Sequence, residues 1–508
     1  EACKALTLLV TFLAYASFHM SRKAPSVVKS VLCPSKGNSN ALARRSHRLL
    51  RVNQGGWAPF NGKDGKTELG NLDMAFLLTY AVGMFFTGHI ADHMNLRHFL
   101  VIGLVMSGLF TALYGAAFFW DVHDVYYFLF VQVFGGLFQS MGWPAVVAVV
   151  GNWFAKGKRG LIMGIWNSHT SVGNILGATV PAAVLHFGWG WCMVVPGAVM
   201  GAIAIIVGLF LVVDPTEVGL PSPYKKESEA GSSHIGGDNE TGLPRASGDA
   251  VSAVTERTAS SSSLASSGSG GAGRKADSVS FVRALSIPGV ATFACSLFFA
   301  KLVAYTFLYW LPFYVNNTVI GGKSIGPTEA ANLSTLFDVA GILGGVVAGY
   351  LSDRTRASGT IATGFLMFAV PALYMYQAWG HVNLITNIIL MMLSGFFVNG
   401  PYALITTAVS AELGTHESLK GNAKALATVT AIIDGTGSLG AAVGPPLTGL
   451  ISSSYGWSKV FFMLYVAAGC AALMLFPVVS AEYRRSRKKR ERNRDSQPEE
   501  SEDAPLLE

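Results

Sequence analysis

The segment Ala5–Leu32, which reads ALTLLVTFLAYASFHMSRKAPSVVKSVL, determines how the rest of the chain is interpreted. It begins with an apolar run close to the roughly 20 residues that a helix needs to cross a bilayer. Two cations, Arg22 and Lys23, interrupt this run. In a helix, Tyr15, His19 and Arg22 share one face, so the segment predicts a membrane-spanning helix with a polar face.

Two interpretations of the cations at positions 22 and 23 are open. A cation deep within a span costs about 2.5 to 3.5 kcal/mol even on lenient scales, so it must face a partner or a water-filled cavity. On this interpretation, the polar face is the floor of an anion-binding site in a transporter. Alternatively, both side chains lie near the end of the helix and extend to the lipid headgroups.

The composition is that of a polytopic membrane protein. Of the 508 residues, 51% are hydrophobic and 13% are charged, which is about half the charged fraction of a soluble domain. The 57 glycines favour close helix packing in lipid. The formal charge of +7, from 37 Lys and Arg against 30 Asp and Glu, is concentrated in particular loops. This pattern predicts a topology in the lipid bilayer rather than binding to nucleic acid.

Hydropathy divides the chain into two groups of six apolar runs, each long enough to cross a membrane. The runs lie near 5–32, 71–92, 98–119, 125–150, 160–185, 190–213, 287–315, 329–351, 359–380, 384–411, 424–451 and 457–480. The segment between the groups is rich in Ser and Gly, so we expect a disordered linker there. The predicted units are an N-terminal bundle at 1–213, the linker at 214–280, a C-terminal bundle at 281–480 and a tail at 481–508.

The two halves repeat a short sequence motif. GHIAD at residues 88–92 follows the second run, and GYLSD at residues 349–353 follows the eighth. A carboxylate near an arginine can tie helix ends together by a charge-assisted bond. The residues expected to form such a cytoplasmic gate are Asp92, Arg97, Asp353 and Arg354. Two like halves in one orientation predict an all-α membrane protein of twelve helices with the major facilitator fold.

Basic residues predict the orientation of the chain. Lysines and arginines gather in alternate short loops and at 484–490, and this side is predicted to be cytoplasmic, with both termini. The loop at 33–70 is an exception, because it carries four arginines on the opposite side. Two sequons, at Asn316 and Asn332, are candidate glycosylation sites close to the membrane. The sequence EDAPLL at 502–507 either binds a sorting adaptor as an acidic dileucine signal or is a solvated, disordered end.

Several motifs resemble those of the organophosphate:phosphate antiporters within the major facilitator superfamily. These are SRK at 21–23, MGWP at 141–144 and RG at 159–160 followed by WN at 166–167. GNWF at 151–154, LYWLP at 308–312 and NGPY at 399–402 look closest to the vertebrate sugar-phosphate exchangers. The resemblance implies exchange of glucose-6-phosphate or glycerol-3-phosphate for inorganic phosphate across the endoplasmic reticulum membrane.

The resemblance also implies a phosphate site between the halves, with Arg22 as one of its cations. Bacterial relatives carry a second basic residue in the seventh helix, where this chain has Ala304. We expect Lys301, one turn earlier on the same face, to replace it as a point-charge phosphate ligand. The alternative is a Lys301 that pairs with an intramembrane acid and touches no ligand. The pocket is expected to be completed by Tyr15, His19, Lys23, His169, Tyr305 and Asn399.

Two acids within the predicted spans are expected to balance these cations. The resemblance implies a salt bridge between Asp338 and Lys23. Asp434 is expected to balance Lys301 or His169, or to carry a proton. Asn399 is a candidate donor to sugar hydroxyls, with polar contact between helices as an equal alternative.

The family signature is altered near the fifth run. It continues after WN with two variable positions, His, Asn, a variable position and two Gly, whereas this chain has SHTSVGN at 168–174. The histidine comes one position early, which rotates His169 by about 100° around the helix. The second glycine is replaced by Asn174.

Other classes of function are disfavoured. We find no nucleophile–base pair or metal set for an enzyme. The GxGxxG pattern at 435–440 lies within a spanning run and not after a strand, so no cofactor is expected. His89 and His93 lack a third ligand, so no metal is expected. The remaining rivals are a proton-coupled organic-anion symporter that uses Asp434, and a membrane sensor or scaffold that does not transport.

Overall fold

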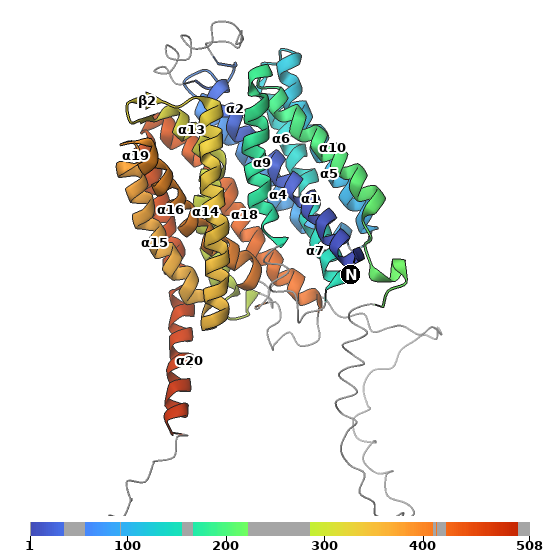
Figure 1. The fold of residues 1–508 in the computed structure, drawn as a ribbon, viewed down its shortest axis with the longest axis vertical. Coiled ribbons are helices and arrows are strands. Elements are labelled where there is room, and N and C mark those ends of the chain that lie inside the picture. The colour runs from blue at the N-terminus through green and yellow to red at the C-terminus, as the bar shows by residue number, and fades with distance from the viewer. Residues whose placement is uncertain are drawn as a thin grey trace, which may run out of the picture.

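The computed structural model describes residues 2–34, 56–91, 93–154, 166–221, 285–409, 413 and 423–495. Asp92, most of the predicted linker and the dileucine sequence lie outside these residues. The described chain is an elongated bundle of nearly parallel and antiparallel helices, seen from the side in Figure 1. The first helices (blue to green) and the later ones (yellow to red) form two groups that lie side by side.

The N-terminal half contains the first six predicted spans, two of them as paired helices. Its helices are α1 (Ala2–Lys23), α2 (Pro25–Leu32), α4 (Gly65–Ala91), α5 (Leu96–Phe119), α6 (Val125–Gln139), α7 (Gly142–Trp153), α9 (His169–Val184) and α10 (Trp191–Phe210), with 3₁₀ helices η2 (Leu185–Phe187) and η3 (Pro215–Val218). The first span is α1 followed by α2, because Pro25 lacks the N–H that would continue the ladder.

The C-terminal half repeats this arrangement. Its elements are α13 (Val290–Asn317), β1 (Val319–Ile320), β2 (Lys323–Ser324), α14 (Pro327–Thr355), α15 (Ser358–Trp379), α16 (Leu384–Leu404), the π-helical turn η4 (Ile405–Val409), α18 (Ala423–Ser454), α19 (Trp457–Met474) and α20 (Phe476–Asp495). The strands β1 and β2 form a short antiparallel hairpin. The last span of each half begins after a glycine with positive φ, Gly188 at 122° and Gly456 at 79°, a conformation that favours glycine.

The fold agrees with a twelve-helix membrane bundle. Eleven helical segments among the described residues are long and apolar enough to cross a membrane. The eleventh predicted span is the helix α18, which is 32 residues long and packs within the bundle against α4 and α13. Large apolar side chains such as Phe86, Ile205, Leu209 and Phe368 are exposed on the outside of the bundle, where a bilayer would cover them.

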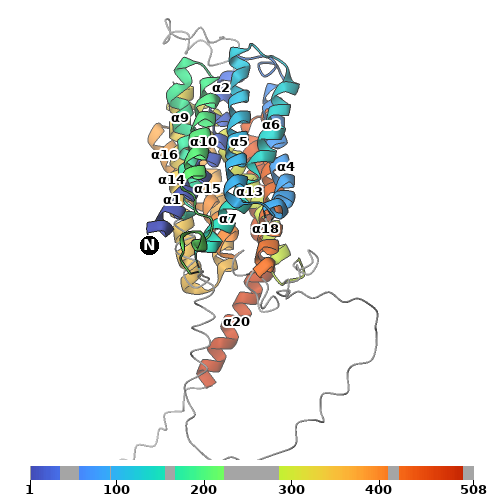
Figure 2. The same cartoon turned by 90° about the vertical axis from the view of Figure 1, so that its right-hand side faces the viewer.

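The two halves meet along α4 with α18 and along α9 with α14. These helices lie next to each other in the side views of Figures 1 and 2. A Cβ on Gly70 of α4 would lie 2.9 Å from the carbonyl oxygen of Pro445, and one on Gly449 of α18 would lie 2.3 Å from that of Lys66. Only glycine allows so close a backbone approach, so the halves are tightly joined at this end of the bundle.

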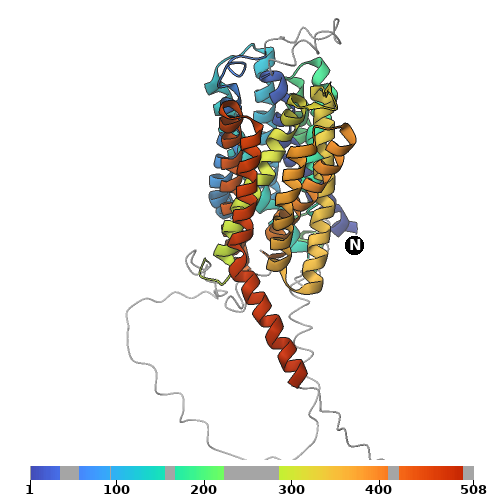
Figure 3. The ribbon, with the colours of Figure 1, turned by 90° about the vertical axis from the view of Figure 1, so that its left-hand side faces the viewer.

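Two ends of the bundle are distinguished below. The tail face is the end from which α20 extends, and the opposite face carries α2 and the β1–β2 hairpin, as Figures 1 and 3 show. Residues 481–495, assigned to the tail from the sequence, continue as the helix α20 beyond the bundle. The close contacts of Gly70 and Gly449 lie toward the opposite face, at the start of α4 and the end of α18.

Candidate functional site

The cations at positions 22 and 23 lie inside the bundle. Arg22 is 3% exposed and Lys23 is 1% exposed, although both end the helix α1. The chain continues directly into α2, so the end of α1 lies in the middle of the span and not at a headgroup layer. The interpretation in which these side chains extend to lipid headgroups is therefore wrong.

Arg22 of α1 is held by neutral groups on three other helices. Its Nε donates to Oε1 of Gln139 on α6 at 2.8 Å, and its Nη1 donates to the hydroxyl of Tyr305 on α13 at 3.2 Å. The guanidinium carbon lies 4.4 Å from the ring centre of Tyr80 on α4. Gln139 is itself fixed by donating to Ser21 Oγ at 3.1 Å.

The remaining nitrogen of Arg22, Nη2, is buried without a hydrogen-bond partner. No carboxylate lies within ion-pair distance of this guanidinium among the described residues. A buried cation with no counter-charge is costly. The arrangement therefore favours an anion that contacts Nη2.

Tyr15, His19 and His169 form an aromatic layer beside Arg22. The Tyr15 hydroxyl lies 3.4 Å from that of Tyr80, and its ring centre is 5.3 Å from His19 and 4.7 Å from His169. Trp166 packs edge-on against His169 at 4.4 Å. The layer brings together three of the site residues expected from the sequence.

The shifted histidine of the signature faces α1. His169 is fully buried, and its Nδ1 lies 3.2 Å from the hydroxyl of Thr170. Its Nε2 has no partner. Despite the one-residue shift, the ring therefore reaches the same cluster as Tyr15.

Lys301 forms a buried ion pair with Asp434. Its Nζ donates to Asp434 Oδ1 at 2.8 Å and to Ser438 Oγ at 3.3 Å, and it lies 5.6 Å from the ring centre of Tyr402. One turn further along α13, Tyr305 links this pair to Arg22 and packs against Tyr402. The structure thus contains an ion pair between Lys301 and Asp434, and contact of Lys301 with phosphate stays a prediction.

The salt bridge expected between Lys23 and Asp338 is absent. Lys23 Nζ instead donates to the carbonyl oxygen of Leu308 at 2.7 Å. This carbonyl is available because Pro312, four residues on within α13, has no N–H to bond it. Asp338 Oδ1 accepts from Asn174 Nδ2 at 3.2 Å. The loss of the signature glycine has thus given Asp338 a different partner.

Asn399 lies at a helix contact. It is half-buried, and a Cβ on Gly341 of α14 would lie 2.3 Å from its Nδ2. This position favours a packing role between α14 and α16 over contact with a sugar.

The residues expected to form a gate at the tail face have other partners. Arg97 pairs with Glu217 at 2.9 Å, and Arg354 donates to the hydroxyl of Tyr350 at 3.2 Å. Asp353 is exposed. The fourth member, Asp92, lies outside the described residues, and no bond between Asp353 and Arg354 is present among the described ones. The gate at the tail face therefore stays a prediction.

Comparison with known proteins places the chain in a family. Residues 57–418 and 322–507 match the Major Facilitator Superfamily. The chain belongs to this superfamily. It is 53% identical over 486 residues to a protein named putative glycerol-3-phosphate transporter 1 from Arabidopsis thaliana, covering 95% of this chain and 89% of that protein. It is 47% identical over 475 residues to the glucose-6-phosphate exchanger SLC37A2 of Mus musculus, covering 94% and 92%.

A solved structure supports the major facilitator fold. The chain is similar to the crystal structure of a bacterial homologue of the human lysosomal transporter Spinster, with a TM-score of 0.58 and 14% identity. The match covers 96% of this chain and 98% of the other.

The opposite face of this major facilitator chain is closed by a buried ion pair. Lys29 of α2 bonds Asp73 of α4, and both side chains are 2% exposed. The ammonium of Lys29 lies 4.2 Å from the ring centre of Trp310 and 5.2 Å from that of Tyr309, both on α13. A pair from one half is thus capped by aromatic rings of the other.

Removing the Trp310 ring is expected to loosen this closed face. The Trp310→Ala variant loses a desolvated cation–π contact worth about 2 kcal/mol. In a background without the native cysteines, we expect disulfide crosslinking of Thr67→Cys with Ser453→Cys to slow by up to about 30-fold, the factor that corresponds to this energy. The hydroxyls of these two residues lie 3.4 Å apart across the halves.

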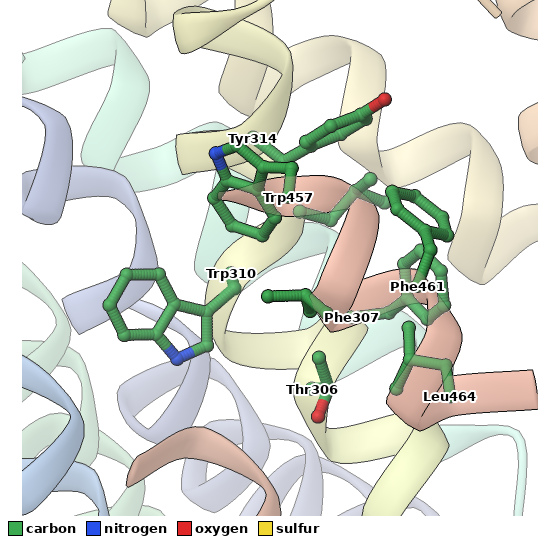
Figure 4. Close-up of a pocket in the computed structure, with 9 residues that line it drawn as sticks. Thr306, Phe307, Trp310, Tyr314, Trp457, Phe461 and Leu464 are labelled. Carbon is green, nitrogen blue, oxygen red and sulfur yellow. The ribbon is translucent and has the colours of Figure 1, made fainter. Parts of the chain in front are cut away.

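The apolar pocket in Figure 4 provides the control. It lies between α13 and α19, and its lining residues are Thr306, Phe307, Trp310, Leu311, Tyr314, Trp457, Val460, Phe461 and Leu464. Trp457 packs in this pocket 6.3 Å from Trp310. The Trp457→Ala variant removes a ring from the pocket without removing the contact to Lys29. Equal crosslinking rates in the two variants would show that the cation–π contact does not keep the opposite face closed.

Several site residues were not identified from the sequence. Gln139 and Tyr80 are the neutral partners of Arg22, and the Lys29–Asp73 pair closes the opposite face. Lys29 lies seven residues, or about two helical turns, after Arg22 and so shares its helical face. The sequence therefore contained a signal that Lys29 also faces the interior. For Gln139 the signal was weaker, a single polar residue in an apolar run.

Proposed function

We propose that this chain is an antiporter that exchanges a sugar phosphate, glucose-6-phosphate or glycerol-3-phosphate, for inorganic phosphate by alternating access. The observation that carries the proposal is the buried Arg22, held only by neutral groups and with Nη2 unpaired. The names of the relatives from plant and mouse, a glycerol-3-phosphate transporter and a glucose-6-phosphate exchanger, support the substrate class.

The charges of the site suit an anionic substrate. The cations Arg22, Lys23 and Lys301 exceed the acids Asp338 and Asp434 by one (three minus two). The phosphoryl group is held by Arg22 from one half and by Lys301 from the other. Lys301 breaks its ion pair with Asp434 when phosphate binds. Opposed cations suit a doubly negative group, and a lysine serves as a point charge for it.

Obligate exchange follows from the unpaired positive charge of Arg22. Without an anion, Arg22 would have to pass through the occluded state with no counter-charge, which is unfavourable in a low dielectric. The carrier therefore changes conformation readily only when loaded with phosphate or a sugar phosphate.

The membrane is that of the endoplasmic reticulum, with both termini in the cytoplasm. The basic residues of the tail face support this orientation. Asn316 is an unsuitable glycan acceptor, because its amide is buried and donates to the carbonyl of Ile325. The dileucine sequence would serve as a site for a sorting adaptor.

Counterflow in reconstituted vesicles tests the proposal. Vesicles loaded with labelled phosphate should release it when glucose-6-phosphate or glycerol-3-phosphate is added outside, and should retain it when glucose or glycerol is added. A pH gradient without external phosphate compounds should have no effect. Release driven by the pH gradient alone would favour the proton-coupled symporter, and no release under any condition would favour a sensor or scaffold.

A further inference from the structure

A second polar cluster lies beside the proposed phosphate site. It consists of Asn174 on α9 and Asp338 on α14, with His19 of α1 next to Asn174. Asn174 is 7% exposed, Asp338 is 6% exposed, and His19 is 3% exposed. None of these residues was needed to hold Arg22 or Lys301.

Close helix packing brings Asn174 to this position. A Cβ on the preceding Gly173 would lie 2.5 Å from the Cβ of His19, and a Cβ on Gly177 would lie 2.6 Å from the Cβ of Lys23. These two glycines let α9 pack tightly against α1. Asn174 is thereby held between α1 and the C-terminal half, at the level of the site residues.

The unpaired atoms in this cluster have a common chemistry. Asn174 donates its Nδ2 to Asp338 Oδ1, which leaves Asp338 Oδ2 and Asn174 Oδ1 buried without a hydrogen bond. Both atoms are acceptors. Nδ1 of the neighbouring His19 is unpaired as well and is a candidate donor to Asn174 Oδ1, so Asp338 Oδ2 is the acceptor with no donor beside it. Buried polar groups are almost always hydrogen-bonded, so this cluster is suited to a ligand that supplies donors.

The phosphoryl group does not meet this need. The phosphoryl dianion of an ester offers only acceptors, and inorganic HPO4²⁻ has a single O–H donor. The carboxylate of Asp338 would repel both anions. The hydroxyl groups of a sugar or of glycerol are donors, and a carboxylate is a strong acceptor for them. The cluster and the Arg22 site therefore recognise different parts of one molecule.

We propose that Asn174 and Asp338 form a hydroxyl-binding subsite that selects phosphate esters of polyols over inorganic phosphate. This inference rests on the proposed exchange function and extends it to the organic part of the substrate. Because the two residues come from opposite halves, a bound hydroxyl group also bridges α9 and α14. His19 packs against Tyr15 beside Arg22, with 5.3 Å between the ring centres.

The test compares esters with and without hydroxyl groups. Inorganic phosphate, methyl phosphate and glycerol-3-phosphate compete for uptake of labelled phosphate into vesicles that contain wild-type protein, Asn174→Ala or Asp338→Asn. The expected result is that glycerol-3-phosphate loses about tenfold in affinity relative to methyl phosphate in both variants, the size expected when a hydrogen bond to a charged or amide acceptor is lost. The affinity for methyl phosphate relative to that for inorganic phosphate should change much less.

Thr179→Ala is the matched control on the same helix. Thr179 is half-buried and donates to the carbonyl of Ile175 within α9, so this variant should keep the wild-type ratios. Elution as a single monodisperse peak shows that each variant is folded.

The outcomes separate this inference from the proposed function. A wild-type protein that takes up no phosphate under any condition overturns the exchange function itself. Wild-type exchange together with an unchanged ratio of glycerol-3-phosphate to methyl phosphate in both variants overturns only the subsite. An equal loss of affinity for all three competitors would assign the pair a purely structural role, which also overturns it.

Discussion

Replacing Arg22 with alanine is expected to reduce phosphate exchange by at least about 100-fold, which corresponds to roughly 3 kcal/mol. The guanidinium is buried, has no acidic partner among the described residues and keeps Nη2 without a hydrogen bond. Its loss removes the charge that draws the phosphoryl group out of water. The measurement is counterflow of labelled phosphate in vesicles with matched amounts of reconstituted protein.

Arg22→Lys is expected to fail nearly as severely. A lysine retains the charge, but it cannot reproduce the planar fork that reaches Gln139 and Tyr305 while leaving Nη2 for the ligand. This variant separates charge from geometry: exchange at the wild-type rate would show that a point charge is sufficient.

Arg487→Ala serves as the matched control for Arg22→Ala. Arg487 lies on α20 and forms an exposed pair with Glu491 at 2.9 Å, and such pairs contribute little to stability. This variant should exchange phosphate normally. If Arg22→Ala also exchanged normally, the phosphate site would have to lie elsewhere.

The sequence was sufficient to predict the two halves, and it favoured an interior position for Arg22 over one at the lipid headgroups. Both predictions depend on local properties, namely the length of each apolar run and the cost of a cation within one. The burial of Arg22 at 3% exposure is the outcome expected when such a cation faces the bundle interior and not lipid.

The partners of the charged groups could not be predicted in the same way. The acceptor for Lys23 is a backbone carbonyl 285 residues away, freed by Pro312 in the other half. The resemblance assigned Lys23 to Asp338, but Asp338 accepts a hydrogen bond from Asn174 instead. This change of partner depends on the packing of α9 against α14, which the motif around Lys23 does not contain. Pairing between helices depends on packing that no single run encodes.

Breaking the Lys301–Asp434 pair on one side is expected to be more damaging to stability than removing both charges. Each single variant, Lys301→Met or Asp434→Ala, leaves an uncompensated charge inside the bundle, at a cost of about 3 to 5 kcal/mol. The double variant leaves none, so its thermal stability in detergent should return close to that of the wild type.

Transport by the double variant decides the role of Lys301. If Lys301 is the phosphate ligand of the C-terminal half, the stable double variant should bind phosphate at least about tenfold more weakly. The Lys29→Met/Asp73→Ala variant is the matched control, because it likewise neutralises a buried Lys–Asp pair, one that contacts neither Arg22 nor Lys301. Its phosphate affinity should stay within about threefold of the wild type. A Lys301→Met/Asp434→Ala variant with wild-type affinity would instead mean that Lys301 only neutralises Asp434, and Arg22 would be the sole cation in contact with phosphate.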